Sequence, residues 1–158
     1  PEVERYFDFD QPWTTSLGEA RATLAAALGV LGQTDAAAAL YGPLKEWTGV
    51  SAYVLTGASS IPQLVSRVLG MAAAAGGLPD EAAGHFKAAL AQARELGAKT
   101  ELAEAGYWYA HFLAGCGRPG DREHVRRLLA EARAVWEGAG MPKHLERAHQ
   151  LEAATGSD

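Results

Sequence analysis

The chain has 158 residues, a formal net charge of −5 at pH 7 and a hydrophobic content of 48%. This length suits one domain with a buried core, and the acidic balance argues against a general nucleic-acid binder. The single cysteine, Cys116, excludes an internal disulfide and a cysteine-rich zinc site.

Charge is distributed unevenly along the chain. The first 20 residues hold five acidic residues and one basic residue, whereas residues 118–149 hold seven Lys/Arg and five acids. Such a mixture is typical of a solvated helix face, and an acidic partner is the alternative. With no run of about 18 apolar residues and no signal-peptide layout, we expect a cytoplasmic protein without membrane contact. The first residue is Pro1 rather than Met, and we expect the chain to be part of a longer protein.

The predicted elements begin with an N-terminal extension over residues 1–13, which precedes a helical-repeat domain over residues 14–154. Helix-period patterns dominate this domain. Its first helical hairpin covers about residues 14–47. We expect Gly42 and Pro43 to end or kink the second helix of this hairpin, because proline removes an amide donor and crowds the preceding turn.

An irregular, apolar stretch over residues 48–59 separates the first hairpin from the second. We expect this stretch to pack on a helix, and a short edge strand is the alternative. The second hairpin covers about residues 60–97. Its first helix is expected to start at Ile61, where apolar residues recur at i, i+3 and i+4, with Pro62 tolerated in the first turn.

The third hairpin covers about residues 100–138, and Thr100 is a candidate cap for its first helix. The motif "GCGRPGD" turns the chain, and Asp121 is a candidate cap for the next helix. A closing helix is expected over residues 142–154, and its polar outer face suits the end of a stack.

Residues 69–90, "LGMAAAAGGLPDEAAGHFKAAL", combine a large–small pair, a turn glycine and the A-x3-F spacing. This combination resembles the tetratricopeptide repeat. The resemblance implies an all-α fold: a right-handed α-solenoid of three hairpins plus a C-terminal capping helix. The positions that carry the pattern are Leu69, Gly70, Gly77, Ala82, Phe86, Ala89 and, in the third hairpin, Leu129. Small residues permit close helix crossings, and the aromatic fills the gap between hairpins.

The spacing between hairpins is longer than in the standard repeat. The equivalent residues Ala25, Gly70 and Ala110 lie 45 and 40 residues apart, against about 34 in the family. Residues 77–142 also look similar to the C-terminal helical region of large actinobacterial regulators, namely LuxR-type or SARP-like proteins and cyclase-linked ATPases. The cues are "ARELGA", "GRPGDRE" and "GAGMP". This likeness implies a bacterial protein whose ATP-binding, catalytic or DNA-binding domains lie outside the chain.

The sequence carries no recognisable catalytic or cofactor-binding set. Short glycine stretches lack the spaced lysine of a phosphate-binding loop. The five histidines do not form the i, i+4 pair of a helical metal site. We therefore expect a non-enzymatic protein with no cofactor and no metal.

The resemblance places the contact residues of the concave groove on the first helix of each hairpin. Carried onto this sequence, the positions are Arg67, Met71, Glu104, Tyr107 and His111. These residue types combine contact area with a polar or adaptable end. Trp108 and Phe112 either share in the groove or pack against a neighbouring element.

Two functions are weighed. The first is a protein-interaction or regulatory module of a larger signalling or transcription regulator, with a peptide, a protein or another domain of the parent chain in the groove. The alternative is a sensor that binds a small effector and controls an attached ATPase or DNA-binding domain. A closed pocket lined by Tyr53, Tyr107 and His111 favours the sensor, and an open groove favours the interaction module. We expect no direct nucleic-acid contact. An exposed Trp13, Trp47 or Trp136 would favour a homo-oligomer.

Overall fold

The computed structural model describes residues 24–26, 28–47, 53–56 and 61–156, and these residues are predominantly helical, as predicted. Residues 24–26 and 28–30 are helical and precede the first labelled helix. The labelled helices are α2 (Thr34–Ala39), α3 (Tyr41–Trp47), α4 (Val65–Ala75), α5 (Pro79–Glu95), α6 (Lys99–Cys116), α7 (Arg122–Gly138) and α8 (Pro142–Thr155). A 3₁₀ helix, η3 (Pro119–Asp121), precedes α7. The predicted N-terminal extension and the start of the first hairpin lie outside the described residues.

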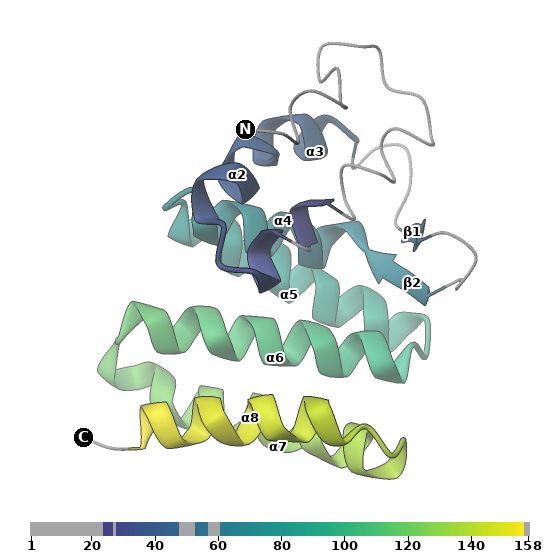
Figure 1. Ribbon diagram of the computed structural model, residues 1–158, viewed down its shortest axis with the longest axis vertical. Coiled ribbons are helices and arrows are strands. Elements are labelled where there is room, and N and C mark those ends of the chain that lie inside the picture. The colour runs from purple at the N-terminus through teal and green to yellow at the C-terminus, as the bar shows by residue number, and fades with distance from the viewer. Residues whose placement is uncertain (1–23, 27, 48–52, 57–60, 157–158) are drawn as a thin grey trace.

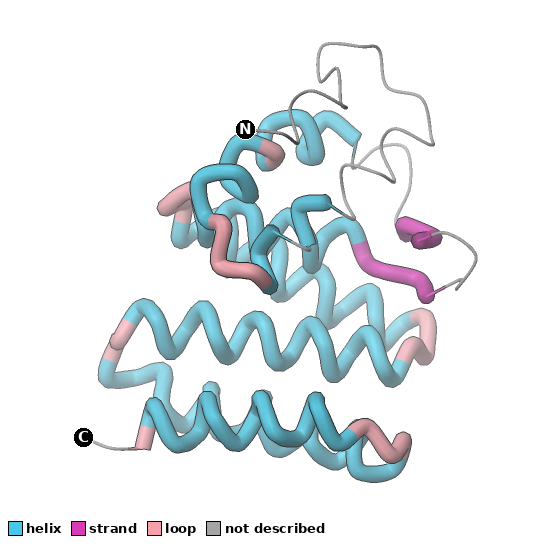
Figure 2. The backbone as a smooth tube through the Cα atoms, viewed as in Figure 1, coloured by secondary structure: helices cyan, strands magenta, loops and turns pink. Residues whose placement is uncertain are grey.

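The helices pack in the order in which they follow one another along the chain. From α4 to α8, each helix contacts the next, and α4 also contacts α2 and α6, while α6 also contacts α8. Figure 1 shows α6 running between the α4–α5 pair and the α7–α8 pair. Alternate helices therefore touch one another as well as their neighbours in sequence, and Figure 2 shows how short the connecting turns are.

Four turns between helices share one backbone geometry. In each, a glycine has a positive φ, and the next residue donates its N–H to the carbonyl five residues earlier. At Gly77, for example, φ is 69° and the Leu78 N–H donates to the Ala73 carbonyl at 3.0 Å. This Schellman arrangement satisfies a terminal carbonyl and suits glycine, which has no Cβ. Because such connections are only a few residues long, successive helices lie antiparallel.

The contact between Gly70 and Phe86 explains the small residues of the second hairpin. Phe86 is 1% exposed. A Cβ placed on Gly70 would lie 2.8 Å from the Phe86 ring, closer than van der Waals contact permits. The Phe86 ring also stacks on Tyr109, with centroids 5.6 Å apart. The other positions of the predicted pattern, Leu69, Ala82, Ala89 and Leu129, are buried too. At the crossing of α4 and α5, the missing Cβ of Gly70 therefore makes room for the Phe86 ring.

The predicted start of the first helix in the second hairpin is wrong by four residues. Residues 61–64 form strand β2 (Ile61–Leu64), which pairs antiparallel with β1 (Tyr53–Thr56). The helix begins only at Val65, with Leu64 in an extended N-cap conformation. The reason lies in Pro62, which disfavours the helical conformation at Ile61. For residues 48–59, the structure shows the alternative expectation, a short strand, which is β1.

Two smaller expectations differ from the structure, and one is confirmed. The N-cap of α6 is Ala98 rather than Thr100. Asp121 is the N-cap residue of α7, as predicted, although its side chain makes no cap hydrogen bond. The helix that was expected to end or kink at Gly42 and Pro43 ends earlier, at its C-cap Leu40. Pro43 therefore lies in the first turn of α3, where proline is tolerated. Of the tryptophans whose exposure would favour a homo-oligomer, Trp136 is fully buried, and the side chains of Trp13 and Trp47 lie outside the described residues.

Candidate partner-binding groove

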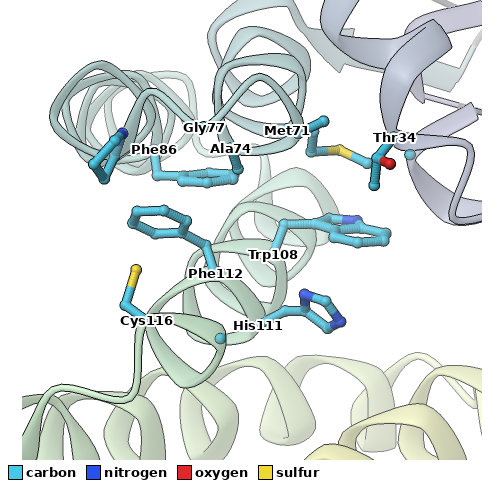
Figure 3. A pocket seen from close by; sticks show the side chains of 13 residues that line it. Thr34, Met71, Ala74, Gly77, Phe86, Trp108, His111, Phe112 and Cys116 are labelled. Carbon is cyan, nitrogen blue, oxygen red and sulfur yellow. The ribbon is translucent and has the colours of Figure 1, made fainter.

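A groove of about 520 Å³ lies between α4, α5 and α6. Its larger lining side chains are aromatic or contain sulfur, and Gly29 and Thr34, on either side of the turn before α2, also line it. The lining residues on which its chemistry depends are Met71, Phe86, Trp108, His111, Phe112 and Cys116. Figure 3 shows Trp108 and Phe112 on the side of α6 that faces Met71, Ala74 and Phe86.

The sequence of α6 explains why its side chains meet at this groove. Trp108, His111, Phe112 and Gly115 follow one another at i, i+3, i+4 and i+7, which places them on one helix face. The facing wall of α4 includes Ala74 and Ala75, and Gly115 adds no side chain. Large aromatics opposite small residues leave the space between them unfilled.

The groove is electrically neutral. No Lys, Arg, Asp or Glu side chain is among the described residues that line it. His111 is exposed at the groove, and desolvation by its surroundings lowers its pKa below the ordinary 6.5, which favours the uncharged imidazole. Its ring lies 5.5 Å from that of Trp108. Such a lining suits an uncharged, apolar ligand group with at most one or two hydrogen bonds.

Two of the five predicted groove residues line this groove: Met71 and His111. Arg67 lies elsewhere. It is 5% exposed, and its Nε donates to Glu101 Oε1 at 2.5 Å. Its remaining contacts are an Nη2–Oε2 bond of 3.4 Å to Glu101 and an Nη1–Sδ distance of 3.7 Å to Met71. The expectation that Arg67 offers an exposed polar end is therefore corrected.

Glu101 joins three elements at the entrance to α4. Besides Arg67, its Oε1 accepts the backbone N–H of Leu64 at 3.0 Å. Leu64 is both the last residue of β2 and the N-cap of α4. A carboxylate from the first turn of α6 therefore satisfies a helix N-terminus that has no capping side chain of its own.

Glu104 and Tyr107 contribute to the contact between α6 and α8 rather than to the groove. Glu104 forms an ion pair with Arg147 and lies 3.3 Å from His144 Nε2. The Arg147 guanidinium stacks over the Tyr107 ring at 4.3 Å and over the Trp136 ring at 4.9 Å. Burial raises the pKa of Tyr107, and the nearby Glu104 adds to this against the opposing effect of Arg147. These residues hold the last helix on the stack.

The sequence did not identify Phe86, Gly115 and Cys116 as groove residues. Phe86 was expected only as a buried plug, but it also lines the groove. The helical spacing of Trp108, Phe112 and Gly115 was the available signal. It could be interpreted only once α4 was known to place small residues opposite.

A second hollow of about 580 Å³ lies where α6, α7 and α8 meet, and its lining mixes Arg118, Arg122 and Arg126 with Asp121 and Glu152. Among the described residues, no group of three His, Cys, Asp or Glu side chains is arranged to hold a metal ion. No helix in the described part of the chain has the length and hydrophobicity needed to cross a bilayer. No family model, curated protein or solved structure matches the chain significantly.

Proposed function

We propose that the chain is a non-enzymatic interaction module of tetratricopeptide-like type, built as a right-handed α-solenoid. Its groove binds a peptide segment that presents large apolar side chains. The observation that carries the proposal is the neutral, aromatic groove between α4 and α6, with His111 exposed at its edge. Aromatic residues and methionine are enriched in the buried centre of protein–protein interfaces.

Support for the repeat assignment comes from the contacts and turns. The α2–α4, α4–α6 and α6–α8 contacts place alternate helices side by side, as stacked hairpins require. The Schellman turns repeat one backbone geometry along the chain. The proposal extends to a role within a larger cytoplasmic signalling or transcription regulator, where the groove would take a partner protein or another domain of the same parent chain.

The test uses a glycine that lines the groove and a matched glycine that does not. Gly115 of α6 and Gly84 of α5 are both exposed, and a Cβ on either meets nothing within 4 Å. Gly115→Phe therefore attaches a large ring to a groove-lining position with room for its Cβ, and Gly84→Phe adds the same side chain elsewhere.

A random dodecapeptide library is selected on the wild-type chain, and enriched peptides are measured by fluorescence anisotropy. We expect Gly115→Phe to weaken binding at least tenfold, a change of about 1.4 kcal/mol, and Gly84→Phe to leave it unchanged. Equal binding by all three chains, or no enriched peptide at all, would contradict the proposal.

A small-effector sensor is the second candidate, because a 520 Å³ groove falls within the range of small-molecule sites, which is about 300–1,000 Å³. Tyr107, which the sensor hypothesis expected in the lining, does not line the groove. The side chain of Tyr53 lies outside the described residues. Small apolar compounds that raise the melting temperature of wild type and Gly84→Phe, but not of Gly115→Phe, would favour this candidate over the peptide.

A further inference from the structure

The second hollow, where α6, α7 and α8 meet, is lined by three exposed arginines. Arg122 and Arg126 lie about one turn apart on α7, and Arg118 lies between the end of α6 and η3. A guanidinium presents N–H donors in a fixed arrangement that matches the two oxygens of a carboxylate. The hollow has a volume of about 580 Å³, so it has room for side chains of a ligand.

The carboxylates that also line the hollow do not cancel its positive charge. Glu152 is already bound by Arg133, whose Nη1 donates to both of its oxygens at 3.2 and 3.1 Å. Arg126 pairs with Glu123, but these side chains are 72% and 81% exposed, and such a pair contributes less than about 1 kcal/mol. Against the three lining arginines there remains the carboxylate of Asp121. The hollow therefore favours an anionic ligand.

The second hollow and the groove lie on opposite sides of the last turn of α6. Phe112 and Gly115 line the groove, whereas Leu113 and Ala114 line the hollow. At 3.6 residues per turn, these two pairs face in opposite directions. Figure 1 shows this turn at the side of the stack where α8 also ends. One ligand that crosses the turn would therefore reach both sites.

The surface that such a ligand must cross carries little side-chain bulk. Ala114 and Gly115 are adjacent in sequence, and Gly115 is exposed, with nothing within 4 Å of a Cβ placed on it. A helix with its side chains is about 10–12 Å wide, and an extended peptide advances about 3.3 Å per residue. A peptide therefore crosses this turn of α6 with about three or four residues.

We propose that the second hollow binds acidic side chains of the same peptide whose large apolar side chains occupy the groove. Aspartate or glutamate residues, about three or four positions from the apolar ones, contact Arg118 and Arg126. This inference rests on the proposed function and adds the charge of the partner to it: an apolar segment with acidic residues on one side.

The test starts from the dodecapeptides that are enriched on the wild-type chain. We expect Asp or Glu to be enriched about three or four residues from the aromatic side chains. Each peptide is resynthesised with Glu replaced by Gln and Asp replaced by Asn, and binding is measured by fluorescence anisotropy. The neutral versions should bind wild type about tenfold more weakly, a change of about 1.4 kcal/mol. Added salt should weaken binding of the acidic versions more, because salt screens exposed charges.

Two double variants with the same change in net charge locate the effect. Arg118→Ser/Arg126→Ser removes two guanidinium groups from the hollow. Lys87→Ser/Arg127→Ser removes two exposed cations that line neither the hollow nor the groove. Circular dichroism should show unchanged helicity in both.

We expect the hollow variant to bind acidic and neutral peptides equally, because the two changes remove the same interaction. The control variant should distinguish the peptides as wild type does. Enriched peptides without Asp or Glu, equal binding of both versions by wild type, or equal losses in the two variants would overturn the inference.

The outcomes separate the two proposals. If binding is sensitive to Gly115→Phe but not to the hollow arginines, then only the inference about acidic side chains fails. If binding is sensitive to the hollow arginines but not to Gly115→Phe, then the proposed function of the groove fails and the hollow remains a site for acidic ligands. If no peptide is enriched, both fail.

Discussion

The pair between Arg67 and Glu101 gives the sharpest stability prediction, because both charges are buried. The two side chains are 7% and 6% exposed, and Nε and Oε1 are 2.5 Å apart. Glu101→Gln keeps an oxygen for the Leu64 N–H but leaves the Arg67 guanidinium uncompensated. Removing one partner of a buried ion pair costs about 3–5 kcal/mol. For a domain of this size, each kcal/mol shifts the melting temperature by about 2–4 °C.

We therefore expect Glu101→Gln to lower the melting temperature by about 6–20 °C. Thermal and urea unfolding are followed by circular dichroism at 222 nm. The double variant Arg67→Met/Glu101→Gln removes both charges, so it should be more stable than Glu101→Gln alone. As a control, Glu123→Gln breaks a pair with Arg126 that is 2.6 Å long but largely exposed, and should change stability by less than about 1 kcal/mol. A Glu101→Gln chain as stable as wild type, or additive losses in the double variant, would refute the reasoning.

Three further predictions concern packing and pH. Phe86→Ala removes a side chain that is 1% exposed and should cost about 3–5 kcal/mol in urea unfolding; an unchanged midpoint would exclude its packing role. Gly70→Ala forces a Cβ to within 2.8 Å of the Phe86 ring and should cost about 1–3 kcal/mol, with Phe86→Leu recovering part of the loss; simple additivity would contradict direct contact. Burial and the neighbouring Arg147 lower the pKa of His144, and burial lowers that of His111. The unfolded chain therefore binds more protons, and the free energy of unfolding should fall as pH drops through 6.5. A His111→Gln/His144→Gln chain should lose less stability than wild type between pH 7 and 5.5. Equal losses in the two chains would contradict the predicted direction of the pH dependence.

The helices and turns could be predicted from sequence because their signals are local. Leu69, Gly70, Ala82 and Phe86 follow a helical period, and a glycine marks each Schellman turn. Pro62 carried a local signal too, since the residue before a proline avoids the helical conformation. That signal was overlooked because the apolar positions of the helical pattern continue back to Ile61.

The candidate site was less predictable, because it depends on which residues face one another across helices. Arg67 has the right residue type and helix face for a groove contact. Its burial follows from Glu101, which lies 34 residues further along the chain. Trp108 and Phe112 could be groove or core residues until the small side chains of α4 were placed opposite them. Non-local pairing of this kind leaves no periodic trace in a single sequence.

The central claim, that the space between α4 and α6 is where a peptide binds, has a direct test in the two methionines of the chain, Met71 and Met141. Met71 lines the groove, whereas Met141 lies at the turn between α7 and α8. The protein is labelled with ¹³C at the methionine methyl groups and titrated with a library-selected peptide. The account predicts that the Met71 signal shifts to saturation while that of Met141 stays in place. A peptide that binds with Met71 unmoved, or with Met141 moving instead, would contradict it.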